Sequence, residues 1–404
     1  MLQPKLRFKE FSEKWQEKKL EEVTSYIDYR GKTPAKTENG IFLVTAKNIK
    51  KGFIDYNSSK EYVSSQSYDE VMKRGKPQIG DVLLTTEAPL GNVAQVDKQN
   101  IALAQRVIKF RGKEKLLDNT FLKYIFLSEG FQTLLRNKAI GTTVLGIQGK
   151  VLHKLVLYIS RDLKEQKKIA DFLSSVDVKI NLTENKLELL KEYKKGIMQK
   201  IFNQELRFKD SNGNDYPEWE EKKLGDITKF SKGKLISKED ITDTGVECIR
   251  YGELYTTYNE VINKVVSKTN LDISTLVLSE KNDIIIPCSG ETAIDIAKAS
   301  CVTKSGVALG GDLNILKLNE NGIFLSYYLN NKAKYQIVSL AQGASVVHLY
   351  EDHLKKLKIK VPILQEQQKI ADFLSAIDSK IEKISDELEN LKEFKKGLFQ
   401  QMFV

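Results

Sequence analysis

The sequence lacks the features that mark membrane proteins, secreted proteins and zinc modules. No apolar run approaches the roughly 20 residues that a membrane-spanning helix needs, and the first ten residues carry charges instead of the apolar core of a signal peptide. The three cysteines, Cys248, Cys288 and Cys301, show no C-x-x-C spacing, so neither a disulfide framework nor a zinc site is encoded. We therefore expect a cytoplasmic protein that does not contact a membrane.

The motifs of several enzyme classes are also missing. The only G-K-T, Gly31-Lys32-Thr33, has Tyr26 where a P-loop needs its first glycine. None of the seven prolines adjoins another, so the [Asn/Asp]-Pro-Pro-aromatic loop of amino-methyltransferases is absent. There is no Gly-x-Ser-x-Gly, and the three histidines have no partners at metal-ligand spacing. The sequence predicts a protein that is not an enzyme and binds no metal or cofactor itself.

The composition is that of a globular protein with an excess of positive charge. Its 404 residues, 41% hydrophobic and 29% charged, predict roughly two to four domains. Lys and Arg outnumber Asp and Glu by 64 to 54, which favours a polyanionic partner such as nucleic acid. Nearly all of this excess lies in residues 1–160 (27 against 17), whereas residues 203–361 are balanced (21 against 22). The second region would therefore need a local patch to bind nucleic acid.

The chain is an internal duplication with a period of about 200 residues. Residues 161–202 align without gaps to residues 362–403, and 23 of 42 positions are identical. Further matches are Leu6 to Lys9 with Leu206 to Lys209, Trp15 with Trp219, Asp81 with Asp283, and Gly141 to Thr143 with Gly343 to Ser345. We interpret both tryptophans as core residues or docking anchors and not as platforms on which bases stack.

Two segments, residues 161–202 and 362–404, have the 3.5-residue apolar period of a coiled coil. The apolar seam positions are Ile169, Leu173, Val176, Ile180, Leu187, Leu190 and Ile197 in the first segment, and Ile370, Leu374, Ile377, Ile381, Leu388, Leu391 and Leu398 in the second. A lone helix cannot leave such a stripe in water, so we expect the two helices to bury each other's stripes. Lys194 and Lys395 are polar seam positions that set the register, unless Tyr193 and Phe394 beside them take over the contact.

The remaining segments are expected to form two globular heads, head 1 (residues 1–160) and head 2 (residues 203–361). Each head combines strand-like runs with one helix-like stretch. The expected strands are 41–45, 82–86, 107–110, 284–286 and 314–318, and the expected helices are 121–137 and 323–340. Only about three residues connect the first long helix to head 2, so a second helix packed along the first must run antiparallel to it. The fold class is mixed α/β: two α/β heads joined by two long antiparallel coiled-coil helices, with pseudo-two-fold symmetry.

Polar loops that follow strands are the usual place for recognition residues. The candidates in head 1 are Arg30, Lys32, Thr33, Lys47, Asn48, Thr85, Thr86, Glu87, Gln105, Arg106, Thr142 and Thr143. Those in head 2 are Arg250, Tyr251, Ser289, Glu291, Thr292, Gln342 and Ser345. Ordinary turn chemistry is the alternative for each. Arg30, Arg106 and Arg250 are favoured because arginine, of which the chain has nine, can pair with guanine through two hydrogen bonds.

Taken together, these features resemble the DNA specificity subunits of type I restriction-modification systems. The resemblance is carried by two copies of E-Q-x-K-I-A-D-F-L (165–173 and 366–374), K-K-G near each helix end (194–196 and 395–397), the W-x-x-K-K-L starts, and Gly31 to Pro34, which is similar to the family's G-G-T-P. The proline that precedes the second helix, Pro362, is replaced by Ser160 or Arg161 in the first copy. Head 2 has Gly233-Lys234-Leu235 instead of G-x-T-P.

The resemblance implies that each head is a target-recognition domain for one half of a bipartite double-stranded DNA sequence. It implies that the helices act as a ruler and a docking post for two methyltransferase subunits and two restriction subunits, which are translocases and nucleases. S-adenosylmethionine and ATP with Mg²⁺ are expected on those partners and not on this chain. Two other functions stay open: a two-headed protein-binding scaffold without DNA recognition, and, less favoured, a duplicated enzyme with an unfamiliar site.

Overall fold

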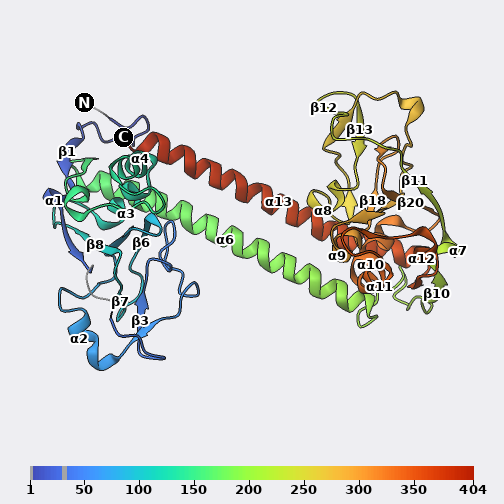
Figure 1. Cartoon of the computed structure of the whole chain (residues 1–404), viewed down its shortest axis with the longest axis horizontal. Coiled ribbons are helices and arrows are strands. Elements are labelled where there is room, and N and C mark those ends of the chain that lie inside the picture. Colours follow the sequence, from blue (N-terminus) through green and yellow to red (C-terminus); the bar gives the residue numbers. More distant parts are fainter. Residues whose placement is uncertain (1–2, 30–33) are drawn as a thin grey trace. The chain divides into compact units, whose positions relative to one another are not determined.

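The computed structural model describes residues 3–29 and 34–404, and the chain divides into two compact units (Figure 1). Unit 1 comprises Met1–Glu184 and Asp386–Val404, and unit 2 comprises Asn185–Ser385. Each unit contains one head and half of each long helix, α6 (Leu163–Phe202) and α13 (Leu364–Met402). The boundaries between the units therefore lie near the middles of the long helices, whereas the predicted domain boundaries lie at the helix ends.

The described part of head 1 contains three small sheets. The first has the strand order β2-β8-β5-β6, the second has the order β4-β3-β7, in which β3 and β7 are parallel, and the third is the antiparallel pair of β1 and β9. The strands are β1 (Gln16–Lys19), β2 (Thr24–Asp28), β3 (Ile41–Val44), β4 (Tyr62–Val63), β5 (Val82–Thr86), β6 (Leu90–Gln95), β7 (Ala102–Leu103), β8 (Val107–Gly112) and β9 (Val156–Ile159). The helices are α1 (Leu20–Val23), η1 (Ser65–Ser67), α2 (Tyr68–Val71), α3 (Asn119–Leu127), α4 (Glu129–Lys138) and α5 (Gly149–Leu152). Strand β5 is buried along its whole length, as the apolar run Val82 to Leu84 predicts for its first three residues.

Head 2 repeats this plan with additions. Its larger sheet has the order β11-β20-β16-β18-β14, and its second sheet, β12-β15-β13-β19, contains the parallel pair β13 and β19. The strands are β10 (Glu220–Lys223), β11 (Thr228–Lys232), β12 (Ile241–Thr242), β13 (Val246–Ile249), β14 (Val261–Ile262), β15 (Ser267–Thr269), β16 (Ile284–Pro287), β17 (Ser289–Gly290), β18 (Ser300–Val302), β19 (Ala308–Leu309), β20 (Leu313–Leu318), β21 (Val347–His348) and β22 (Lys358–Val361). The helices are α7 (Leu224–Ile227), α8 (Glu253–Thr256), η2 (Ile273–Thr275), α9 (Ala293–Ile296), α10 (Gly322–Asn331), α11 (Lys334–Leu340) and α12 (Glu351–Lys355).

The five predicted strands are all present as β3, β5, β8, β16 and β20, but the single helix predicted in each head is wrong. Residues 121–137 belong to two helices, α3 and α4, because Ser128 takes an extended conformation between them. The Ser128 hydroxyl accepts a hydrogen bond from Phe131 N and so caps the second helix. In head 2 the equivalent stretch divides into α10 and α11. Trp15 and Trp219 are buried, which confirms them as core residues.

The weak match between Asp81 and Asp283 is a true structural equivalence. Each carboxylate accepts a 2.8 Å hydrogen bond from the amide three residues earlier, and both side chains are buried. Their electrostatic surroundings differ. Burial disfavours ionised Asp81, but hydrogen bonds from Arg111 (2.6 and 2.8 Å) and the charge of Lys109 lower its pKa. No comparable ion pair reaches Asp283 among the described residues, and burial raises its pKa.

We expect Asp81→Asn to destabilise unit 1 at pH 7 by about 2 to 3 kcal/mol, since it leaves buried Lys109 unpaired; the value allows for the partial exposure of Arg111. The stabilisation of the folded state by ionised Asp81 is complete above the unfolded-state pKa near 4. It is lost as the pH falls through the lower pKa of the folded state. The pH dependence that Asp283 contributes has the opposite sign. Because its folded pKa is raised, its ionisation lowers the free energy of unfolding as the pH rises from about 4. Asp283→Asn should therefore stabilise unit 2 at pH 7. Urea unfolding of both variants at pH 4 and pH 7 measures these changes in the free energy of unfolding. Equal destabilisation by the two substitutions at pH 7 would contradict the predicted difference between Asp81 and Asp283.

The predicted coiled-coil pairing is present within each unit. The seam residues are buried or partly buried in both helices. In unit 1, Asp177 of α6 pairs with Lys395 of α13, while Glu184, further along α6, pairs with the earlier Lys392, so these halves are antiparallel. Tyr193 and Phe394 are each about half exposed and do not replace the seam lysines.

A buried Arg–Trp–Glu cluster ties the start of each head to the start of its long helix. In unit 1, Glu165 accepts hydrogen bonds from Arg7 at 2.8 and 2.9 Å and from Trp15 Nε1 at 3.1 Å. In unit 2, Glu366 accepts hydrogen bonds from Arg207 at 3.3 and 2.8 Å and from Trp219 Nε1 at 3.3 Å. One physical requirement explains why both copies contain the Leu-Arg-Phe-Lys, tryptophan and E-Q segments. Each buried carboxylate needs a charged donor from arginine and a polar donor from tryptophan.

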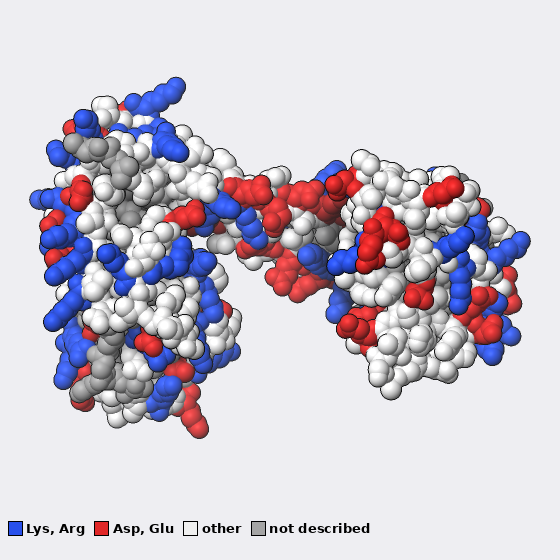
Figure 2. Space-filling view, turned by 45° about the horizontal axis from the view of Figure 1, so that its top comes forward, with Lys and Arg blue, Asp and Glu red and all other residues white. Residues whose placement is uncertain are grey.

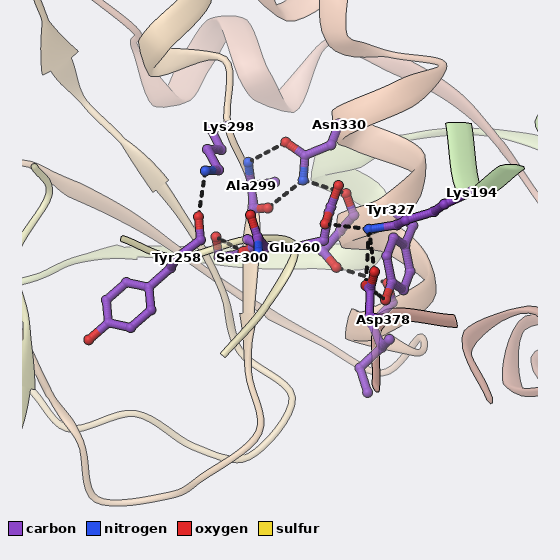
Figure 3. Close-up of polar contacts among 12 residues, drawn as sticks. Lys194, Tyr258, Glu260, Lys298, Ala299, Ser300, Tyr327, Asn330 and Asp378 are labelled. Carbon is purple, nitrogen blue, oxygen red and sulfur yellow. Dashed lines mark hydrogen bonds and ion pairs between the residues drawn. The ribbon is translucent and has the colours of Figure 1, made fainter. Parts of the chain in front are cut away.

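A Lys–Asp–Tyr cluster joins the two long helices to the head in each unit. In unit 2, Lys194 Nζ lies 2.7 Å from Asp378 and 3.0 Å from Glu260, and the Tyr327 hydroxyl donates to Asp378 at 2.5 Å (Figure 3). In unit 1, Lys395 and Tyr124 bind Asp177 in the same way, at 2.5 and 2.8 Å. Burial disfavours the Lys194 charge, but Glu260 and Asp378 outweigh it and raise the pKa of Lys194. The polar seam lysines thus select specific partners, as a register device requires.

Candidate nucleic-acid interface

The two heads present loops at the same point of the fold, the carboxyl ends of a parallel strand pair. In head 1, β3 pairs with β7, Leu43 with Ala102 and Val44 with Leu103. In head 2, β13 pairs with β19, Cys248 with Ala308 and Ile249 with Leu309. Residues 45–48 and 104–106 follow the strands of head 1, and residues 250–253 and 310–312 follow those of head 2. This alignment pairs Thr45 with Arg250, Asn48 with Glu253, and Arg106 with Asp312.

A buried side chain braces the first loop in each head. Asn48 Oδ1 accepts hydrogen bonds from Thr45 N (2.9 Å) and Thr45 Oγ1 (2.8 Å), and its Nδ2 donates to the carbonyls of Asp55 and Ser59. Glu253 accepts from Arg250 N at 3.0 Å and from Ser267 Oγ at 2.6 Å. Asn48 is fully buried, so this candidate shapes its loop from inside and is not on the surface.

The second loop ends in a residue with a left-handed backbone in both heads. Arg106 has φ 72° and Asp312 has φ 58°. The Arg106 carbonyl accepts a hydrogen bond from Thr86 N at 3.0 Å, and the Asp312 carbonyl accepts one from Cys288 N at 2.7 Å. This conformation is uncommon for residues other than glycine, and it turns the chain directly into the next strand, β8 or β20. Both side chains are exposed.

Each pair of loops borders a hollow. The head 1 hollow, about 220 Å³, is lined by Lys36, Leu43, Thr45, Ala46, Lys47, Glu61, Ala88, Ala104, Gln105 and Arg106. The head 2 hollow, about 490 Å³, is lined by Leu235, Ile236, Ser237, Lys238, Arg250, Tyr251, Gly252, Glu253, Tyr255, Thr256, Gly311 and Asp312. Both hollows carry charged side chains, and the head 2 hollow adds the exposed aromatic ring of Tyr251. Such concave surfaces suit the edges of ligands that carry hydrogen-bonding groups.

Comparison with known proteins identifies the family that uses this duplicated plan. The model of the type I restriction modification DNA specificity domain matches residues 12–192 and again residues 216–393. The chain belongs to this family.

Relatives of the specificity-domain family match along most of the chain. The MjaVIII type I restriction enzyme specificity subunit of Methanocaldococcus jannaschii is 26% identical over 96% of this chain and 91% of its own length. The MjaIX specificity subunit of the same organism is 24% identical over 85% of this chain and 80% of its own length. The crystal structure of a type I restriction-modification S subunit from M. genitalium, 17% identical, covers 100% of this chain and 99% of its own, with a TM-score of 0.65. This likeness supports the fold of two similar heads and two long helices.

Within the specificity-domain plan, several predicted site residues come together in head 1. Lys47, Gln105 and Arg106 line one hollow. Glu87 lies beside it, 3.7 Å from the Arg106 guanidinium. The exposed loop with Thr142 and Thr143 ends at Gly146, which forms a β-bridge with Glu87. Arg30, Lys32 and Thr33 lie outside the described residues.

Other head 1 candidates are interior. Thr85 and Thr86 are buried, and the Thr85 hydroxyl accepts a hydrogen bond from Asn92 N at 2.9 Å. They continue the buried strand β5, which explains why a polar pair there need not reach the surface. The repeat contained this information, because the match of Asp81 with Asp283 places Thr85 and Thr86 opposite the apolar residues Pro287 and Cys288, which are also buried.

In head 2, Arg250 and Tyr251 line the hollow, but Arg250 also forms an ion pair within the protein. Its guanidinium lies 3.5 Å from Glu253. Ser289 is buried in β17, which pairs with β21. Thr292 caps α9 by accepting a hydrogen bond from Asp295 N, so turn chemistry explains it. Glu291, Gln342 and Ser345 are exposed.

Sequence reasoning missed several residues of the two hollows, above all Asp312. The signal for Asp312 was present, since Ala102-Leu103 and Ala308-Leu309 are the same dipeptide three residues before Arg106 and Asp312. The charge difference between the heads is also visible. In Figure 2, Lys and Arg gather over head 1, whereas much of head 2 on that face is uncharged.

The described residues contain neither a membrane-spanning helix nor a cluster of metal ligands. No helix among them is long and apolar enough to cross a membrane. No group of three or more His, Cys, Asp or Glu side chains in the described parts of the chain could hold a metal ion.

Proposed function

We propose that this chain is the sequence-specific DNA-binding subunit of a type I restriction-modification complex and that each head reads one half of a bipartite target. One observation carries the proposal: the two heads share a backbone frame but present different side chains at its matched surface points. A shared frame with Thr45 and Arg106 in one head, and Arg250 and Asp312 in the other, suits two readers that approach DNA alike and select different bases.

The chemistry of the complex belongs to its partners in this proposal. The chain is a non-catalytic subunit, and two methyltransferase subunits with S-adenosylmethionine and two restriction subunits with ATP and Mg²⁺ supply methylation and cleavage. Exposed apolar side chains on α6, Val178 and Leu182 in unit 1 and Leu189 and Tyr193 in unit 2, support docking of partners on this helix.

An exchange of heads tests the proposal. Residues 206–360 are replaced by the equivalent head of a relative, and the assembled complex is expressed in cells whose methylated adenines are then mapped. We expect one half of the methylated sequence to change and the other half to stay, because each head has its own core. A folded chimera that changes both halves, or a parent complex without any sequence preference, would contradict independent reading by the heads.

A salt titration separates DNA binding from the scaffold alternative. A complex that contacts several phosphates releases counterions, so its affinity for the target duplex should fall by orders of magnitude between about 50 and 200 mM salt. Binding that is independent of salt and of DNA sequence would support a protein scaffold.

A further inference from the structure

The two heads carry opposite charges at one matched point of the frame, and this difference indicates what each head reads. Arg106 and Asp312 both follow the Ala-Leu strand of the parallel pair, both have a left-handed backbone, and both accept a hydrogen bond through their carbonyls. A strained backbone retained at the same place in two divergent copies is typical of a functional position. The fold therefore holds the two side chains in equivalent places while their chemistry differs.

Resting on the DNA-binding function proposed above, we propose that Arg106 reads a guanine in one half of the target and that Asp312 reads the exocyclic amino group of an adenine or cytosine in the other. A guanidinium donates two hydrogen bonds that fit guanine O6 and N7 in the major groove. An ionised carboxylate only accepts hydrogen bonds, so it fits adenine N6 or cytosine N4 and is repelled by the guanine acceptors.

Both side chains are free to make such contacts. The Arg106 side chain is 45% exposed and has a long 3.7 Å ion pair with Glu87, which is 44% exposed. An ion pair of this kind contributes little and can open at small cost. The carboxylate of Asp312 is exposed, and no described side chain or backbone group forms an ion pair or hydrogen bond with it. Neither side chain is needed to hold the loop, because the backbone carbonyls do this.

The surroundings are consistent with this assignment. Lys36 and Lys47 line the same hollow as Arg106, so they can neutralise phosphates beside a guanine contact. In head 2, Lys238 and Arg250 line the hollow with Asp312 and offset the repulsion between its carboxylate and the DNA backbone. Arg106 and Asp312 thus differ in the sign of their charge, but each hollow contains cationic side chains that can contact the DNA phosphates.

The test uses the full chain assembled with its methyltransferase subunits and the duplex that this complex methylates. Single bases of the duplex are replaced by analogues that lack one group: 7-deazaguanine for guanine, purine for adenine, and 2-pyrimidinone for cytosine. The variants are Arg106→Gly and Asp312→Gly, because glycine accepts a positive φ and keeps the backbone of each loop. Lys47→Ala is the matched control for a phosphate contact. Dissociation constants are measured for every pair of protein and duplex.

For the wild type, we expect one 7-deazaguanine in one half and one amino-deleted base in the other half to weaken binding about ten-fold. Arg106→Gly should bind the unmodified duplex about ten-fold more weakly and lose sensitivity to that 7-deazaguanine alone. Asp312→Gly should lose sensitivity to the amino deletion alone. Lys47→Ala should weaken all duplexes equally and keep both sensitivities.

The inference is overturned if Arg106→Gly retains every guanine sensitivity, if Asp312→Gly retains every amino sensitivity, or if both act on the same half. Its failure differs from failure of the proposed function. If only the inference fails, the wild-type complex still prefers its target over random duplex. If the proposed function fails, the wild-type complex shows no preference for any duplex.

Discussion

Replacing Glu165 by Ala is expected to lower the free energy of unfolding of unit 1 by about 3 to 5 kcal/mol. The Glu165 side chain is 1% exposed, and its removal leaves the Arg7 guanidinium and the Trp15 Nε1–H without their acceptor. A buried charge that loses its partner costs far more than a surface pair, because water cannot replace the lost hydrogen bonds. Glu366→Ala should have a similar effect on unit 2, since Glu366 is fully buried against Arg207 and Trp219.

Urea unfolding followed by tryptophan fluorescence measures this loss, because each cluster contains one of the two tryptophans. Glu184→Ala is the matched control: Glu184 lies on the same helix as Glu165 and pairs with Lys392 at 3.1 Å, but both side chains are 44% exposed. It should cost less than about 1 kcal/mol. Glu165→Ala with a cost as small as that of Glu184→Ala would show that the cluster does not hold the head to its helix.

These clusters show why the duplication was visible in the sequence. Glu165 and Trp15 lie 150 residues apart, yet both recur in the second copy because each unit needs the same buried carboxylate and donors. The seam residues were predictable for a related reason: the burial of a helix stripe leaves a regular period. The roles of Lys194 and Lys395 followed from their polar character at apolar seam positions.

The candidate site was less predictable because its geometry depends on pairing between distant strands. Asn48 is a polar residue in a polar loop. Its position in the sequence does not show whether its side chain stabilises the loop from inside or contacts a DNA base. Its role depends on the carbonyls of Asp55 and Ser59, which only the folded loop brings to it. Asp312 was missed because arginine was favoured as a base reader, although the repeat places Asp312 opposite Arg106.

Lengthening both long helices should change the spacing of the target without changing the bases recognised. The design repeats residues 180–183 after Thr183 and residues 381–384 after Ile384. The Lys–Asp–Tyr clusters are 17 residues apart on each helix (177 to 194 and 378 to 395), so a matched insertion of four keeps both clusters possible. Insertion in α6 alone makes the separations 21 and 17, and we expect that variant to lose one cluster and to assemble poorly.

Four residues add about 6 Å to a helix and rotate it some 40° beyond one turn, and a coiled coil can absorb four residues as a stutter. One DNA base pair advances about 3.4 Å and turns by roughly 35°, so length alone gives nearly two extra base pairs and rotation alone about one. We therefore expect the doubly lengthened subunit, in its assembled complex, to methylate sites whose non-specific spacer is longer by one or two base pairs. Mapping methylated adenines in cells measures this spacer. Efficient methylation at the original spacing would show that the helices do not set the distance between the half-sites.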